Sequence, residues 1–226
     1  PEGFVLEASA SGSQTDAGIT ANKVNDGWKI KDASGADVTK RFAVSKTIDG
    51  TLTVNKAPVE ITTGSASKAY DGDALTNAEA TIKGIVKGET ATVQATGSQT
   101  EIGSSSNTYE VNWGTAKDSN YSVTENLGTL TVTDNDVDVT LTAASASKTY
   151  DGAALTNNGV TASGLPKGFT VEATASGSQI DAGSSANVVN DGYIIRNAKG
   201  EDKTANFKKV QKINGTLTVN PKAVTV

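Results

Sequence analysis

The stretch Gly128-Thr-Leu-Thr-Val132 occurs three times in this chain, and it decides the fold class. The other two copies are Gly50-Thr-Leu-Thr-Val54 and Gly215-Thr-Leu-Thr-Val219. In each copy a glycine frees the backbone, and apolar residues then alternate with threonines at the period of two that is typical of a β-strand. The leucine and valine of each copy are therefore predicted to face one side of a sheet. We interpret the stretch as the closing strand of a small β domain.

Other motifs return around this stretch in a constant order. Tyr70-Asp71-Gly72 recurs as Tyr150-Asp151-Gly152, and Gly97-Ser98-Gln99 recurs as Gly12-Ser13-Gln14 and Gly177-Ser178-Gln179. Self-similarity of this kind is the signature of a repeat protein.

The repeats predict the domain organisation. The segment Pro1 to Asn55 aligns without a gap on Pro166 to Asn220, with more than half of the positions identical. We therefore expect the C-terminal part of a β repeat domain at 1–57, complete β repeat domains at 58–136 and 137–222, and the start of a further unit at 223–226. We expect the missing front half of the first repeat to have been removed from a longer protein.

The hydrophobic pattern predicts an all-β fold. Apolar residues alternate with a period of two, and no long window shows helical spacing. Each repeat is predicted to be a small β-sandwich of the Ig-like kind or an open β-grasp-like sheet, two alternatives that a unit of this size leaves open. The linkers are short, and two of them contain proline, so we expect the domains to lie end to end as an elongated rod. Whether the closing strand lies parallel or antiparallel to the first strand stays open.

Composition excludes several classes of function. The chain carries a net charge of −5 and has no basic cluster, so nucleic acid is not an expected partner. Because it contains neither cysteine nor histidine, it lacks disulfides, Ser-His-Asp triads and the usual zinc sites. No apolar run approaches the roughly 18 residues of a membrane span. We predict a monomer that is not an enzyme, needs no cofactor and does not insert into a membrane.

The order Tyr-Asp-Gly, Ala-Leu-Thr, Gly-Ser-Gln and Gly-Thr-Leu-Thr-Val resembles the tandem YDG/MBG-type repeats of bacterial surface adhesins, chiefly of Gram-positive bacteria. The resemblance covers nearly the whole chain. It implies an extracellular stalk attached to the cell wall, which projects a distal binding domain toward a host surface glycan or protein. The alternative function is a set of repeats that themselves bind carbohydrate or mucin.

Aromatic side chains are the candidate ligand-binding residues of that alternative. The candidates are Tyr70, Tyr150, Trp28, Trp113 and Tyr193. Exposed rings one repeat apart stack well on sugars. The competing and favoured interpretation is that each ring fills a thin core, with the neighbouring Asp-Gly forming a turn.

Acidic and basic side chains provide two further hypotheses. Asp134, Asp136 and Asp138 alternate at a domain junction and offer carboxylate ligands of the kind that calcium prefers, although a solvated acidic linker explains them equally well. Lys68 and Lys148 precede the Tyr-Asp-Gly motifs, where a buried lysine would be needed for an isopeptide crosslink. We favour a partly exposed lysine beside a turn.

Overall fold

The computed structural model describes residues 2–225, and these residues form β-strands joined by turns. The all-β prediction is confirmed. The helical elements of this part of the chain are three short turns of 3₁₀ helix, η1 (Thr39–Arg41), η2 (Asp118–Asn120) and η3 (Thr204–Asn206). Among these residues no helix is both long enough and apolar enough to cross a membrane.

The chain divides into two compact units, and the division runs through the middle repeat. The first unit holds the described residues up to Thr63 together with 78–95 and 109–127. The second unit holds 64–77, 96–108 and the described residues from Gly128 onward. The domain boundaries near residues 57 and 136, and the rod-like arrangement of the domains, stay predictions.

The first unit contains the described strands of the first repeat and five strands of the middle repeat. Those of the first repeat are β1 (Val5–Glu7), β2 (Ala10–Ser11), β3 (Gly18–Val24), β4 (Lys29–Lys31) and β5 (Gly50–Val54). Those of the middle repeat are β6 (Ala57–Thr63), β8 (Ala80–Lys83), β9 (Thr92–Ala95), β11 (Tyr109–Asn112) and β12 (Tyr121–Asn126). Strand β6 lies between β12 and β8, and β9 pairs with β11.

The second unit contains the remaining strands of the middle repeat and the whole last repeat. From the middle repeat come β7 (Ala66–Ala69), β10 (Gly103–Ser106) and β13 (Thr129–Thr133). The last repeat holds β14 (Val139–Ala143), β15 (Ala146–Thr149), β16 (Val160–Ser163), β17 (Thr170–Glu172), β18 (Ala175–Ser176), β19 (Gly183–Val189), β20 (Ile194–Arg196), β21 (Val210–Ile213) and β22 (Gly215–Asn220). Its sheets have the orders β16-β14-β21, β15-β22-β19-β18 and β17-β20.

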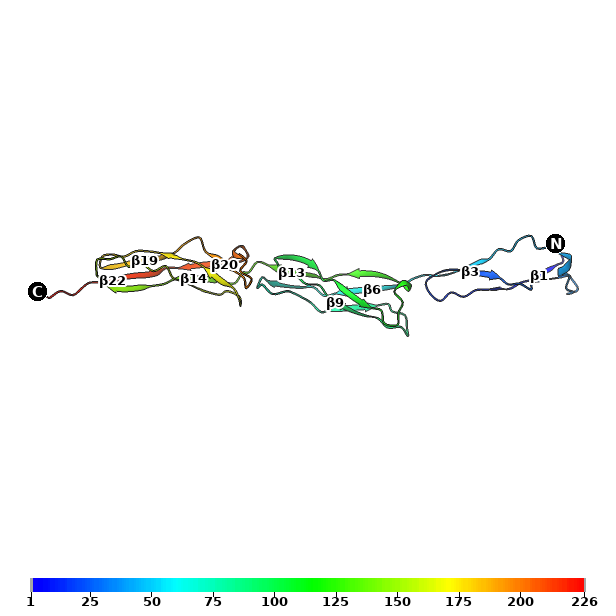
Figure 1. The fold of residues 1–226 in the computed structure, drawn as a ribbon. Coiled ribbons are helices and arrows are strands. Elements are labelled where there is room, and N and C mark those ends of the chain that lie inside the picture. Colours follow the sequence, from blue (N-terminus) through cyan, green and yellow to red (C-terminus); the bar gives the residue numbers. More distant parts are fainter. Residues whose placement is uncertain (1, 226) are drawn as a thin grey trace. The chain divides into compact units, whose positions relative to one another are not determined.

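The closing strands of a complete repeat lie parallel to its opening strands. In the last repeat β21 pairs with β14, which places Val139 opposite Val210, and β22 pairs with β15, which places Ala146 opposite Leu217. The middle repeat shows the same parallel pairing of β12 with β6 and of β13 with β7. Strand β22 also pairs antiparallel with β19, and Figure 1 shows the two strands side by side.

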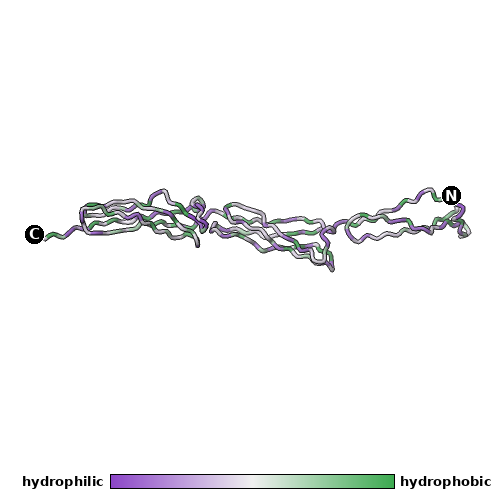
Figure 2. Tube along the Cα trace, in the orientation of Figure 1, coloured by the Kyte–Doolittle hydropathy of each residue, from purple (hydrophilic) through white to green (hydrophobic). Residues whose placement is uncertain are grey.

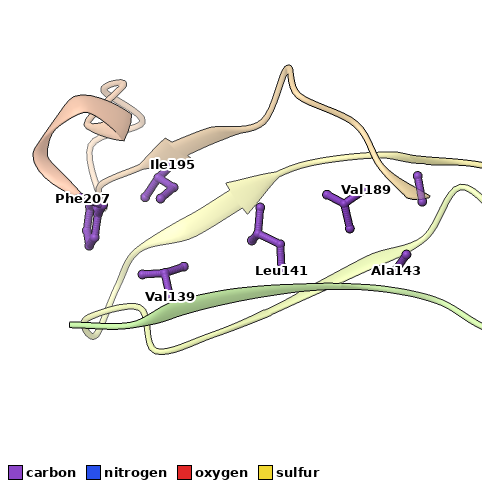
Figure 3. Close-up of a cluster of buried hydrophobic side chains, with 7 residues drawn as sticks. Val139, Leu141, Ala143, Val189, Ile195 and Phe207 are labelled. Atoms are coloured by element: carbon purple, nitrogen blue, oxygen red, sulfur yellow. The ribbon is translucent and has the colours of Figure 1, made fainter. Parts of the chain in front are cut away.

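The core of the last repeat lies between these sheets. Val139, Leu141 and Ala143 alternate with half-buried threonines on β14, and each is at most 2% exposed. Figure 3 shows them following one another along the strand, with Ile195, Phe207 and Val189 across from them. The alternation of apolar and polar residues along the strands is visible in Figure 2. On β14 and β22 this alternation buries one face of the strand, as the sequence pattern predicts.

The closing stretches are buried in the two complete repeats. Leu130, Val132, Leu217 and Val219 are at most 1% exposed. Their equivalents in the first repeat, Leu52 and Val54, are only half-buried. In the last repeat β22 lies between β15 and β19 in one sheet, whereas β5 pairs only with β3 among the described residues.

Candidate functional site

The Tyr-Asp-Gly motif at Tyr70 forms a closed turn at the end of β7. The backbone N–H of Tyr70 donates to the carbonyl oxygen of Thr133 at 2.9 Å, which continues the pairing of β7 with β13. The carboxylate of the next residue, Asp71, accepts a hydrogen bond from the backbone N–H of Asp73 at 3.0 Å. The same carboxylate forms an ion pair with Lys68, whose Nζ lies 2.6 Å away. These bonds hold the turn rigidly at the edge of the sheet.

The ring of Tyr70 is buried by residues of the last repeat, which belong to the same compact unit. Tyr70 is 1% exposed, and its ring meets the ring of Phe169 edge-on with 6.0 Å between centroids. Asn135 Nδ2 donates to the carbonyl oxygen of Tyr70 at 2.8 Å. Burial raises the pKa of the Tyr70 hydroxyl above its usual value. The ring therefore fills the end of a core, as the favoured interpretation of the sequence states.

An ion pair lies beside this ring. Lys203 Nζ is 2.9 Å from Glu101 Oε1 and 3.4 Å from Glu201 Oε2, and the lysine side chain is only 16% exposed. The hydrogen bond to Glu101 raises the pKa of Lys203, so the lysine is charged at neutral pH. The pair joins the loop after Gln99 to the loop before η3.

A shallow depression of about 110 Å³ surrounds these groups. Its walls combine the Tyr-Asp-Gly turn with the loops at Glu101, Phe169 and Asn197. A space of this volume holds a few water molecules, and it is far smaller than the ~300 Å³ typical of ligand pockets. The arrangement suits the joining of two surfaces better than the binding of a substrate.

Tyr150, the equivalent tyrosine of the last repeat, is 40% exposed. Its local structure is the same, because its N–H donates to the carbonyl oxygen of Asn220 at 2.8 Å and Lys148 Nζ lies 2.6 Å from Asp151 Oδ1. Exposure therefore distinguishes the two tyrosines, and local geometry does not.

The other aromatic candidates are half-buried. Trp113 stacks on Tyr121 at 5.4 Å between centroids and packs against the core of the first unit. Tyr193 packs against the core of the last repeat, with Lys212 Nζ above its ring at 5.4 Å. Trp28 lines an apolar groove of about 420 Å³ in the first repeat. Binding of sugar by these rings stays a prediction.

The three aspartates of the predicted calcium site do not converge. Asp134 is half-buried and lies 3.5 Å from Lys208 Nζ, whereas Asp136 and Asp138 are exposed. Within residues 2–225 no group of three acidic side chains is arranged to hold a metal ion. Calcium binding at this junction stays a prediction without a preformed set of ligands.

Lys68 and Lys148 stabilise the turns that follow them through hydrogen bonds. Each lysine contacts the aspartate of its motif and also donates a hydrogen bond to a backbone carbonyl oxygen. Lys68 donates to Asp73, and Lys148 donates to Ala153, both at 2.7 Å. Their side chains are 23% and 21% exposed, so they are neither fully buried nor free in solvent.

Sequence reasoning missed Phe169, Glu101 and Lys203, which complete the site at Tyr70. One signal was present for Glu101, because an acidic residue stands two positions after the glutamine of every Gly-Ser-Gln motif. The contact of Phe169 with Tyr70 had no local signal, because it depends on how consecutive repeats meet.

The fold and this site define a class of protein, namely one built from tandem all-β repeats with parallel closing strands. Residues 59–131 match the family model of the MBG domain (YGX type), which confirms the predicted YDG/MBG-type repeat in the middle of the chain. This family is in general non-enzymatic and points to a surface protein. A comparison with curated proteins found no match.

Proposed function

We propose that the chain is a set of structural spacer repeats from a bacterial surface adhesin, which hold a distal binding domain away from the cell wall. The observation that carries the proposal is the recurrence of one β unit, of which the middle copy matches an MBG domain. A spacer needs modules that can be added in series, because length is then set by repeat number. Repeats, short linkers and an acidic surface all meet this need.

The arrangement of the side chains supports a structural role. Tyr70, a candidate ligand-binding residue, is enclosed by protein, and Trp113 packs on Tyr121. The depression beside Tyr70 is small, and an ion pair spans its edge. We infer that the repeats have no catalytic activity, that they lie outside the cell on its wall, and that the parent adhesin meets host glycans or proteins through another domain.

Small-angle X-ray scattering tests the spacer role. Three domains in series with a maximum dimension of ~100 Å have a radius of gyration of roughly 30 Å, whereas one compact body of this length has about 17 Å. A radius near the smaller value in dilute solution would exclude the spacer arrangement.

The second candidate function is carbohydrate binding, which the exposure of Tyr150 and the groove at Trp28 favour. Tryptophan fluorescence with added host glycans separates the two functions. Spacer repeats show an emission spectrum that glycans leave unchanged. A glycan-dependent quenching that is lost in a Trp28→Ala variant would support binding instead.

A further inference from the structure

The ends of the two complete repeats that carry Tyr-Asp-Gly have the same local structure, whether or not another repeat covers them. Tyr70 and Tyr150 share the strand pairing, the lysine–aspartate contact and a bridge that joins Leu75 to Gln99 in one case and Leu155 to Gln179 in the other. Yet Tyr70 is 1% exposed and Tyr150 is 40% exposed. The same surface therefore exists in a covered and an uncovered form.

In the covered form the next repeat supplies an aromatic ring. Phe169 lies edge-on to Tyr70 and also packs against Phe207, with 5.5 Å between the two ring centroids. It lies so close to the turn that a Cβ atom on Gly72 would come within 2.9 Å of the Phe169 ring. The matching position, Gly152, has no atom within 4 Å of an added Cβ. The uncovered end thus has room for the same ring.

The next repeat also supplies a lysine to an acidic residue at this end. Lys203 is the residue before η3 and contacts Glu101 at 2.9 Å. The first unit contains a second case, in which Lys117, the residue before η2, contacts Asp16 at 2.6 Å. Asn120 Nδ2 adds a hydrogen bond to Asp16 at 2.8 Å. The same pairing of positions thus occurs at two successive repeat junctions, each within one compact unit.

The acidic partner is placed by its own repeat. In every copy the glutamine of Gly-Ser-Gln donates through Nε2 to the backbone oxygen of the acidic residue two positions later, at distances of 2.6 to 2.7 Å. In the last repeat this residue is Asp181, which is exposed and makes no ion pair in the part of the chain described. Its loop is therefore held in the position that receives a lysine at the other two junctions.

We propose that the surface formed by Tyr150, Gly152 and Asp181 is a docking surface for the front end of another repeat of this type. The partner repeat must have a lysine in the position before its short 3₁₀ turn, where the lysine can pair with Asp181. An aromatic ring at the position of Phe169 would pack best against Tyr150. A second copy of this chain fits poorly, because the residue before η1 is Val38 and supplies no charge to Asp181. The inference does not depend on the spacer role.

The experiment is nitration of tyrosines by tetranitromethane in the intact chain, followed by peptide mass spectrometry. The reagent attacks the ionised phenol, so burial protects Tyr70 both by blocking access and by raising its pKa. We expect Tyr150 to react roughly tenfold or more faster than Tyr70, whose ring is reached only by local opening. A second copy of residues 134–222 is then joined after Asn220, the register in which Asp134 follows Thr133.

In this extended chain Tyr150 should become as protected as Tyr70. A Lys203→Glu change in the added copy should restore much of its reactivity, and Asp181→Lys combined with that change should protect it again. In the native chain Lys203→Glu should likewise expose Tyr70, whereas Lys209→Glu, a change at an exposed lysine outside the junction, should not. Hydrogen exchange of the added copy verifies that it is folded.

Two results would overturn the inference. One is a Tyr150 that stays fully reactive beside a folded added repeat. The other is protection of Tyr150 in the native chain that grows with protein concentration, because this would assign the surface to a second copy.

Discussion

Asn187 illustrates how much of a thin β core depends on one polar side chain. It is fully buried, and its Nδ2 donates to the backbone oxygens of Ala144 and Asn157 at 2.8 Å each. Asn107 makes the same two bonds in the middle repeat, at 2.9 Å, to Gly64 and Asn77. In the last repeat the amide joins the two segments that extend from the paired strands β14 and β16.

The change Asn187→Ala should lower the stability of the last repeat by about 2–4 kcal/mol, because two partly buried carbonyl groups lose their donor inside the repeat. Hydrogen exchange of the amides of β19 and β22 measures the effect repeat by repeat. Asn158→Ala, at an exposed side chain of the same repeat, is the matched control and should change little. Equal exchange rates in the two variants would show that the amide bonds contribute nothing.

Tyr109 provides a prediction about pH. Its hydroxyl donates to Glu125 Oε1 at 2.5 Å, and this hydrogen bond raises its pKa to about 12. Because the folded-state pKa lies above the unfolded value near 10, the contribution of this bond is fully present below pH 10 and is lost as the pH rises through about 12. Glu125→Gln should return the Tyr109 pKa toward its usual value, as followed by NMR of labelled tyrosine. A titration of Tyr109 unchanged by this substitution would contradict the assignment.

At the scale of the elements, the parallel closing strand brings two backbones very close together. A Cβ atom on Gly215 would lie 2.4 Å from the carbonyl oxygen of Ala144, a distance that real structures do not show. Gly128 occupies the same position in the middle repeat, with a Cβ 2.2 Å from the carbonyl oxygen of Gly64. The glycine that opens the closing stretch is thus required by packing in the two complete repeats, whereas a Cβ on Gly50 in the first repeat would have no contact shorter than 3.6 Å.

Gly215→Ala should destabilise the last repeat by about 1–3 kcal/mol, the usual range for overpacking, because the added methyl group meets backbone atoms that cannot rotate away. Gly192→Ala is the control, since a Cβ there has no atom within 4 Å and the φ angle of Gly192 is not positive. Urea unfolding monitored by hydrogen exchange compares the free energies of unfolding of the two variants. If both variants unfold alike, the close approach is not a constraint.

At the scale of the whole chain, the first repeat has several strongly exposed apolar side chains. Leu6, Ile19 and Ile48 are 63%, 73% and 74% exposed. The groove of about 420 Å³ at Trp28 and Ile30 matches the face that Val139 and Leu141 cover in the last repeat, where Ile195 is fully buried. The first repeat therefore presents an apolar surface that a parallel pair of opening strands would fill.

Joining a copy of residues 137–165 directly before Pro1 should fill this groove, because Pro1 aligns with Pro166 and the register is preserved. In a Trp113→Phe background, the emission of Trp28 should shift to shorter wavelength as its ring leaves water. The same extension with aspartate in place of its copy of Leu141 is the control and should leave the emission unshifted. An identical spectrum with and without the extension would refute this account of the groove.

The sequence alone sufficed for the properties that depend on neighbouring residues. Alternation at a period of two correctly placed Leu130, Val132, Leu217 and Val219 on buried faces, since a pleated strand sends successive side chains to opposite sides. The repeated motifs also indicated the family of the middle repeat. A strand such as β10, with the sequence Gly103-Ser-Ser-Ser106, escaped prediction because nothing in its composition favours β structure. It is a strand because β13 pairs with it.

Only the tertiary structure decided which strands meet and which rings are covered. The parallel pairing of β21 with β14 joins residues about 70 positions apart, and no local pattern encodes the direction of such a pair. Tyr70 and Tyr150 stand in the same motif, Ser-Lys-x-Tyr-Asp-Gly, yet one is enclosed and the other is open. The physical reason is that burial of a side chain depends on the surface laid against it, and here that surface belongs to a different repeat.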